Sequence, residues 1–137
     1  MQIKKLEFHR RDNATGRLTF LESGPDRDIP FPIRRVYYIY GVAPGERRGF
    51  HAHRKLEQYL ICIHGSCMIL LDDGAEQKNV LLDDPSVGLY VGPGTWREMY
   101  DFSPDAVLLV LASEYYDESD YIREYNAFKD YLEEGKR

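Results

Sequence analysis

The chain has 137 residues, and its 23 Asp and Glu residues outnumber its 18 Lys and Arg residues, which gives a formal net charge of −5. This length fits one domain spanning residues 1–137, because either half alone would bury too small a core. The acidic balance argues against a nucleic-acid partner, and no apolar run forms a signal-peptide core or approaches the roughly 18 residues of a membrane helix, so we expect a cytoplasmic protein without a membrane segment.

Short strand patterns separated by turn residues dominate the chain. Weak alternation on both sides of Asn13-Ala14-Thr15-Gly16 predicts a hairpin within residues 3–21. Aromatic and β-branched residues favour a strand over 34–40, and a further strand is expected around His51 and His53. The other predicted strands are 59–64 and 67–71, joined as a hairpin by Gly65-Ser66, then 80–82 and 88–91 after the turn at Asp72-Asp73-Gly74, and 106–111, buried on both faces.

Many short strands at roughly 8–12-residue spacing are typical of a sandwich or closed barrel, so we predict an all-β jelly roll. Only the tail departs from this pattern. After Ser119 or Asp120 as N-cap, apolar residues recur at helical spacing up to Gly135, which predicts an amphipathic helix that caps the barrel. Cys62 and Cys67 lie in an apolar stretch, which favours buried small side chains over a disulfide or a metal pair.

Two histidines give the first functional signal. Side chains two positions apart in a strand share a face, so His51 and His53 should project into one pocket, although a lone His is more often a hydrogen-bonded interior residue. From Gly45 the chain runs Gly-x5-His51-x-His53-x3-Glu57 and then reaches Gly65. This pattern resembles the first motif of the cupin superfamily, and the resemblance implies a cupin jelly-roll barrel with a pocket for a ligand or a metal.

The cupin motif raises the question of a metal, because two His and one Glu resemble a facial triad for a divalent ion. Metal-binding cupins usually add a His from a later motif, and in the matching stretch 88–98 that His is absent. Arg97 in this stretch is a permanent cation that would repel a divalent ion. We therefore expect no metal and no other cofactor, and we interpret the histidine pair as acid–base machinery.

Longer motifs carry a closer resemblance. They are RVYYI at 35–39, RGFHAH at 48–53, LEQ at 56–58, GSC at 65–67, LDDG at 71–74, VGLYVGP at 87–93 and LASEYYDESDYIR at 111–123. Together they resemble the sugar 3,4-ketoisomerases that act on dTDP-4-keto-6-deoxyglucose. The resemblance implies a metal-free homodimer that makes a dTDP-3-keto-6-deoxyhexose, which an aminotransferase converts into a 3-amino-3,6-dideoxy sugar for surface glycans.

Such a reaction needs a base for the acidified C3 hydrogen and a proton donor at C4, with a 3,4-enediol between them. We expect His51 to be the base, His53 to relay protons to the sugar oxygens, and Tyr37 to be a second donor. A fixed cation would stabilise the enediolate oxygen. The residues expected at the substrate are Arg97 and Arg17 near that oxygen, Arg35 and Arg48 at the pyrophosphate, Gln58 after the His pair, and Trp96 and Tyr116 among the aromatic candidates for stacking on thymine.

Several functional alternatives remain open at this level. They are a 3,5-epimerase of the same sugar nucleotides, a metal-dependent cupin oxygenase and a non-catalytic sugar-nucleotide binding module. Glu57 is expected to be a structural hydrogen-bond partner before a catalyst. Family members that make the galacto product tend to have a His where this chain has Arg97, so the gluco product is favoured.

Overall fold

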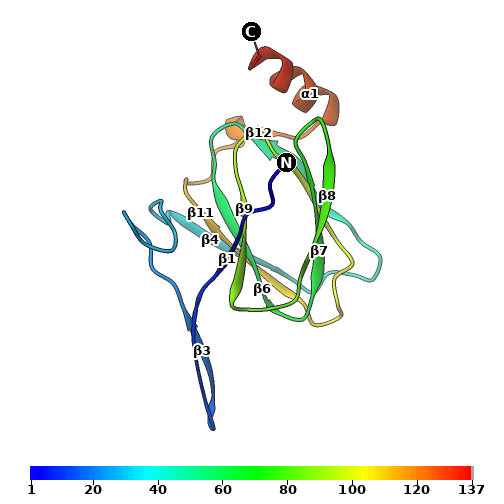
Figure 1. Ribbon diagram of the computed structural model, residues 1–137. Coiled ribbons are helices and arrows are strands. Elements are labelled where there is room, and N and C mark those ends of the chain that lie inside the picture. Colours follow the sequence, from blue (N-terminus) through cyan, green and yellow to red (C-terminus); the bar gives the residue numbers. More distant parts are fainter. Residues whose placement is uncertain (137) are drawn as a thin grey trace.

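Two five-stranded antiparallel sheets form the barrel in the computed structural model, which describes residues 1–136 (Figure 1). The first sheet has the order β1-β9-β6-β11-β4 and the second has the order β12-β5-β10-β7-β8, while β2 and β3 form a separate pair. The elements are β1 (Lys5–Glu7), β2 (His9–Asn13), β3 (Gly16–Phe20), β4 (Arg35–Tyr40), β5 (Arg48–His53), β6 (Gln58–His64), β7 (Cys67–Asp72), β8 (Gln77–Leu82), β9 (Val87–Val91), β10 (Trp96–Tyr100), β11 (Val107–Ala112), η1 (Glu118–Asp120), β12 (Tyr121–Ile122) and α1 (Tyr125–Glu134). The predicted all-β fold with a C-terminal helix is confirmed.

Apolar side chains from both sheets meet inside the barrel. Leu60 of β6 and Leu108 of β11 come from the first sheet, and Ile69 of β7 comes from the second. Cys62 and Cys67 are free and buried in the same core, as their apolar surroundings predict. Burial of such side chains stabilises the fold by about 1.5–3 kcal/mol for each large aliphatic residue, and it leaves the polar pocket at one end of a rigid frame.

The strands β6 and β7 follow each other in sequence but lie in different sheets. The turn at Gly65-Ser66 is correctly predicted, and Gly65 has the left-handed φ of 71° that favours glycine. The hairpin predicted across this turn is wrong, because β6 pairs with β9 and β11 whereas β7 pairs with β8 and β10. Both apolar runs would be buried equally well as a hairpin in one sheet or as strands of two facing sheets. The hydrophobic pattern therefore does not distinguish a hairpin from a crossing between sheets.

The tail is not one helix from residue 119. Residues 118–120 form the turn η1, and β12 then pairs with β5 through Tyr121 opposite His53 and Ile122 opposite Ala52. The helix α1 begins only at Tyr125 and ends before Gly135. Backbone pairing of β12 with the edge of β5 takes the place of the internal hydrogen bonds that a longer helix would make, and it holds the tail against the histidine strand. The strand β10 was not predicted at all.

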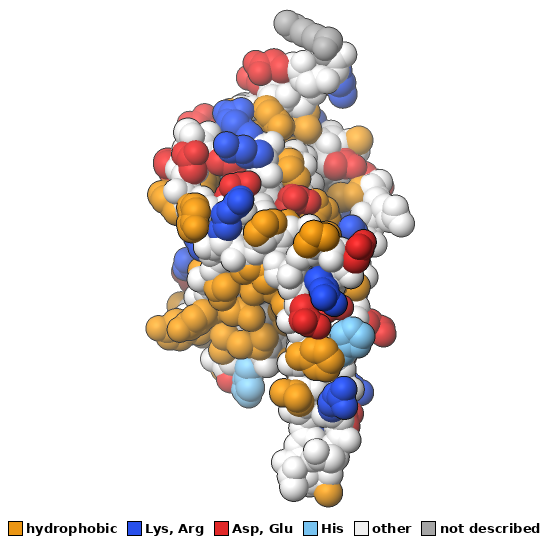
Figure 2. Space-filling model, turned by 90° about the vertical axis from the view of Figure 1, so that its left-hand side faces the viewer, with side chains coloured by type: hydrophobic (Ala, Val, Ile, Leu, Met, Phe, Trp, Pro, Cys, Tyr) orange, Lys and Arg blue, Asp and Glu red, His pale blue; other side chains and the backbone are white. Residues whose placement is uncertain are grey.

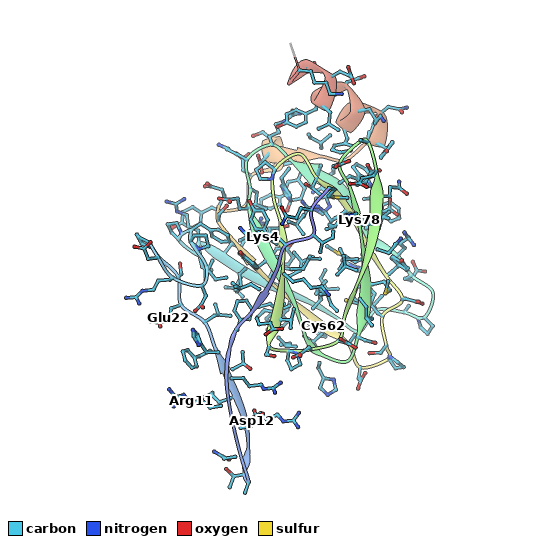
Figure 3. The ribbon with its side chains drawn as sticks, viewed as in Figure 1. Lys4, Arg11, Asp12, Glu22, Cys62 and Lys78 are labelled. Carbon is cyan, nitrogen blue, oxygen red and sulfur yellow. The ribbon has the colours of Figure 1, made fainter. Side chains whose placement is uncertain are left out.

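A hairpin formed by β2 and β3 stands away from the barrel (Figure 1). The predicted turn is confirmed, and the Asn13 side-chain oxygen accepts a hydrogen bond from the Thr15 backbone at 2.8 Å. Figure 2 shows hydrophobic side chains gathered on the side of the barrel next to this hairpin. The labelled Arg11 and Asp12 lie on the hairpin, clear of the barrel (Figure 3). Among residues 1–136, no helix is long and apolar enough to cross a membrane.

Candidate active site

A pocket of about 430 Å³ opens between β4, β5 and the segment that follows β11. Its lining residues are Arg35, Tyr37, Tyr38, Ile39, Arg48, Gly49, His51, Met99, Tyr116, Tyr121 and Arg123. A larger hollow of about 730 Å³ lies between α1 and the β7–β8 turn, but neither histidine nor arginine lines it. The larger hollow is lined by Lys129 and Lys136, whereas the smaller pocket combines a histidine, which can move a proton, with arginines, which can hold an anion.

A bulge in β5 sets the orientation of His51. Arg97 lies opposite His51 and the next residue of β10 lies opposite Gly49, so Phe50 has no partner across the strands and takes a left-handed φ of 57°. The carbonyl of Gly49 lies 3.1 Å from His51 Nδ1. Because a carbonyl only accepts, Nδ1 carries the proton, and the buried Nε2, which has no protein partner, keeps its lone pair. Burial, and then Arg97, lower the pKa of His51 to about 4, so the ring is neutral at pH 7.

His53 lies behind His51, with 4.9 Å between the ring centroids. Its Nδ1 lies 3.1 Å from Oδ2 of Asp120. The Asp120 carboxylate also accepts a hydrogen bond from the Lys55 backbone at Oδ1 and one from the Leu56 backbone at Oδ2. Burial, and then Arg97, lower the pKa of His53 to about 2, so the ring is neutral and donates through Nδ1. Asp120 therefore fixes the tautomer of His53, a role not expected from the sequence, in which Asp120 is a candidate helix cap only.

Arg97 is fully buried beside the pocket. Its Nη1 donates to the side-chain oxygen of Gln58 at 2.5 Å and its Nη2 to the carbonyl of Thr95 at 3.1 Å, while its Nε has no partner. Within residues 1–136 these acceptors are neutral, and no carboxylate forms a salt bridge with this guanidinium. Burial lowers the pKa of Arg97 to about 10, and the side chain remains a cation at neutral pH. An anion formed next to Arg97 would therefore be attracted by a cation that no carboxylate neutralises.

Gln58 lies behind the pocket wall, against the expectation of a substrate contact. Like His53 and Arg97, it is buried and is not among the lining residues, and both of its recorded side-chain hydrogen bonds are to Arg97 and Tyr37. Its side-chain nitrogen donates to the hydroxyl of Tyr37 at 2.9 Å. Burial raises the pKa of Tyr37, although Arg97 and the hydrogen bond from Gln58 oppose the rise, so the phenol keeps its proton.

The rim of the pocket carries cations and aromatic rings. Arg35 lies 5.4 Å from the ring of Tyr37 and 5.6 Å from the ring of Tyr116, and its Nε has no partner. The ring of Tyr121 lies 4.4 Å from that of His53, and the Arg123 guanidinium lies 4.2 Å from the Tyr121 ring. Tyr121 and Arg123 were missed as site residues because the motif that contains them was assigned to a helix.

Three other residues lie outside the pocket. Trp96, expected near thymine, packs beneath α1 with its ring 5.8 Å from Phe128, and its indole donates to Glu98. Arg17 lies on the protruding hairpin, not at the histidines of its own chain. Glu57 accepts a hydrogen bond from the hydroxyl of Tyr90 at 2.7 Å, in agreement with a structural role. Over residues 1–136, no group of three or more His, Cys, Asp or Glu side chains is placed to hold a metal ion.

Comparisons with known proteins agree with this geometry. The family model FdtA, described as WxcM-like, C-terminal, matches residues 1–133. A TDP-4-oxo-6-deoxy-alpha-D-glucose-3,4-oxoisomerase from Aneurinibacillus thermoaerophilus is 52% identical over 132 residues, which cover 96% of this chain and 94% of the relative.

Solved structures give the same result. QdtA, a sugar 3,4-ketoisomerase from Thermoanaerobacterium thermosaccharolyticum in complex with TDP, superposes with a TM-score of 0.93 at 50% identity, covering 97% of this chain and 96% of QdtA. The H51N mutant of QdtA has a crystal structure with TDP-4-keto-6-deoxyglucose. WlaRB, a TDP-quinovose 3,4-ketoisomerase from Campylobacter jejuni, has a TM-score of 0.87 at 45% identity, covering 93% of this chain and 97% of WlaRB.

Proposed function

The chain belongs to the FdtA family and is a sugar-nucleotide 3,4-ketoisomerase, and from this premise we propose that its one domain converts dTDP-4-keto-6-deoxyglucose into a dTDP-3-keto-6-deoxyhexose. The observation that carries the proposal is the pocket in which His51 presents an unpartnered basic nitrogen next to the buried cation Arg97. The 3-keto product would suit an aminotransferase that makes 3-amino-3,6-dideoxy sugars.

Proton transfer through an enediol accounts for the reaction. His51 Nε2 removes the C3 hydrogen as a proton, the C–H electrons form a C3–C4 double bond, and the C4 oxygen gains the negative charge that Tyr37 and Arg97 stabilise. The protonated His51 then returns a proton to C4 while the C3 hydroxyl loses its proton through His53, so that the carbonyl forms at C3. Tyr37 gives its hydroxyl proton to the C4 oxygen, which becomes the C4 hydroxyl of the product. The proton released from the C3 hydroxyl then replaces the one that Tyr37 gave up, so the reaction consumes no net proton.

The same pocket fits a sugar nucleotide. Arg35 and Arg48 both line it, and planar guanidinium groups bind phosphate oxygens in pairs. Tyr116 offers an exposed ring at the rim, where it can stack on thymine. Arg123 lies at the same rim and adds a further cation, although its bidentate contact with Glu118 offsets part of its charge.

The direct test is incubation of the protein with dTDP-4-keto-6-deoxyglucose, followed by NMR of the sugar. The proposal expects loss of the C3 hydrogen signal and appearance of a 3-ketone, with solvent hydrogen exchanged at C3 and C4 only. Exchange at C5 would instead identify a 3,5-epimerase, and binding without turnover would identify a binding module.

We also propose that the reaction needs no metal. Activity that is lost on treatment with a chelator and restored by one added metal ion would contradict this proposal.

We favour the gluco configuration at C4 of the product. A guanidinium with a pKa near 10 is a poor proton donor at neutral pH, so Arg97 would not deliver a proton to the sugar face that it borders. The proton would return from the side of His51. Trapping the product by amination and reading the C4 coupling constants by NMR would decide the configuration.

We propose that the chain forms a homodimer through its hairpin. A two-stranded hairpin is marginal on its own, and the edge strand β4 exposes Val36, Tyr38 and Tyr40 with more than half of each side chain accessible. A partner's hairpin laid over this edge would cover those side chains and could carry Arg17 to a neighbour's pocket. A monomer mass in light scattering would contradict the dimer.

We also propose that the protein is cytoplasmic. The two free, buried cysteines fit this compartment, and cell fractionation would test it.

A further inference from the structure

A chain of three side chains from three strands leads from the buried cation to the pocket. Arg97 of β10 donates to the side-chain oxygen of Gln58 of β6 at 2.5 Å, and the Gln58 nitrogen donates to the hydroxyl of Tyr37 of β4 at 2.9 Å. Gln58 is fully buried, and no other side chain is recorded as its partner within residues 1–136. The amide therefore touches both the cation and the phenol while remaining out of the pocket.

The chemistry of the guanidinium fixes the direction of these hydrogen bonds. A guanidinium has only donors, so the Gln58 oxygen must face Arg97 and its NH₂ group must face Tyr37. The Tyr37 oxygen thus accepts, and its own proton cannot point back toward Gln58. Among the described residues no protein acceptor is recorded for that proton, and Tyr37 lines the pocket. The proton is therefore directed to whatever the pocket holds.

We propose that Gln58 is a positioning residue that turns the hydroxyl proton of Tyr37 toward the reacting oxygen of the substrate. This inference rests on the proposed ketoisomerase reaction and adds to it the direction of proton donation. Glutamine suits the position because a neutral amide accepts from a cation on one side and donates on the other. A carboxylate of the same shape would only accept, and would draw the Tyr37 proton away from the pocket.

Two substitutions separate this role from a merely structural one. Gln58→Glu keeps the shape and places a carboxylate next to Arg97, so its melting temperature should equal or exceed that of the wild type above the pKa of the new group. Its kcat should nevertheless fall by about 10²-fold, because the Tyr37 proton now points to the carboxylate. Gln58→Met leaves Nη1 of Arg97 without its acceptor and should be less stable. The Tyr37 hydroxyl can still rotate toward substrate, so kcat should fall only about tenfold.

The order of activity should thus be opposite to the order of stability for these two variants. A structural role predicts the reverse, with kcat following the melting temperature. TDP affinity, measured by calorimetry, should change by less than about twofold in both variants because Gln58 does not line the pocket. Gln77→Glu is the matched control: Gln77 also donates its amide to an acceptor, Asp72, but far from the pocket, and the change should leave kcat unaltered.

A double-mutant cycle with Tyr37→Phe tests the partner. Gln58→Glu also neutralises Arg97, so some loss should persist, but on the Tyr37→Phe background it should be less than about tenfold, against about 10²-fold in the wild type. An undiminished loss, or a Gln58→Glu enzyme as active as the Gln77→Glu control, would overturn the inference. These measurements are relative to wild-type turnover of dTDP-4-keto-6-deoxyglucose, so an inactive wild type would refute the proposed function instead.

Discussion

Asp120→Asn is the substitution that most directly tests how the histidine pair is held. The carboxylate accepts from Lys55 N at 2.9 Å, from Leu56 N at 3.3 Å and from His53 Nδ1 at 3.1 Å. Asparagine has one acceptor oxygen where aspartate has two. If that oxygen stays on Lys55, the new NH₂ group faces two donors, and His53 must move its proton from Nδ1 to Nε2 to accept it.

The expected losses of folding free energy and of kcat in Asp120→Asn follow from these contacts. Loss of a charged acceptor from buried hydrogen bonds costs about 1.5–3 kcal/mol of folding free energy. With its proton on Nε2, His53 can no longer accept one from the sugar, and a positioned acid–base group is worth about 10²–10⁴ in rate. A wrong histidine tautomer costs serine proteases about 10⁴-fold, which sets the upper end. We therefore expect kcat to fall between about 10²- and 10⁴-fold.

The assay is turnover of dTDP-4-keto-6-deoxyglucose by NMR, with ¹⁵N NMR of the imidazoles to read the tautomer and calorimetry to measure TDP binding. Asp105→Asn is the matched control, because Asp105 contacts His64 at 3.3 Å on the exposed surface. That variant should keep its kcat and its stability within about 0.5 kcal/mol. An Asp120→Asn enzyme with wild-type kcat, or with the proton still on Nδ1 of His53, would refute the reasoning.

Further predictions concern His51, His53, Trp96 and Arg97. His51→Asn should abolish turnover while TDP still binds, and His53→Asn should lose less because water or Tyr37 can replace a relay; appreciable turnover by the first variant would rule out His51 as the base. The pKa of His51 is about 4 in the folded protein and 6.5 in the unfolded chain, so between these pH values the unfolded chain binds more protons. The free energy of unfolding should therefore fall as the pH drops from 6.5 to 4, and it should fall less steeply in His51→Asn. Over the same window kcat/KM should stay level and then fall near pH 4, and a fall near pH 6.5 would contradict the lowered pKa. Trp96→Ala should destabilise the fold by about 3–5 kcal/mol in denaturant titrations while folded protein binds TDP normally, whereas a selective loss of TDP affinity would return Trp96 to the nucleotide site. Arg97→His should change the C4 configuration or the rate, and an unchanged product and rate would exclude position 97 as a control of proton delivery.

Local sequence alone determined the shared face of the two histidines, most strand ends and the family. The two-residue period of a strand placed His51 and His53 on one face, and the ring centroids are indeed 4.9 Å apart. Turn residues located most strand ends, and motifs along nearly the whole chain identified the family. These inferences succeed because they depend on spacing within one strand or on the order of residues along the chain.

Only the tertiary structure decided which residues surround the histidines. Asp120 reaches His53 across 67 positions of sequence, and Gln58 reaches Arg97 across 39. Similar apolar runs in β6 and β7 gave no sign that they join different sheets, and Trp96 was equally suited to a nucleotide or a helix. The site is built where β4, β5, β6 and β10 meet, and which side chains meet there depends on strand register and on closure of the barrel, which the period of a single strand does not contain.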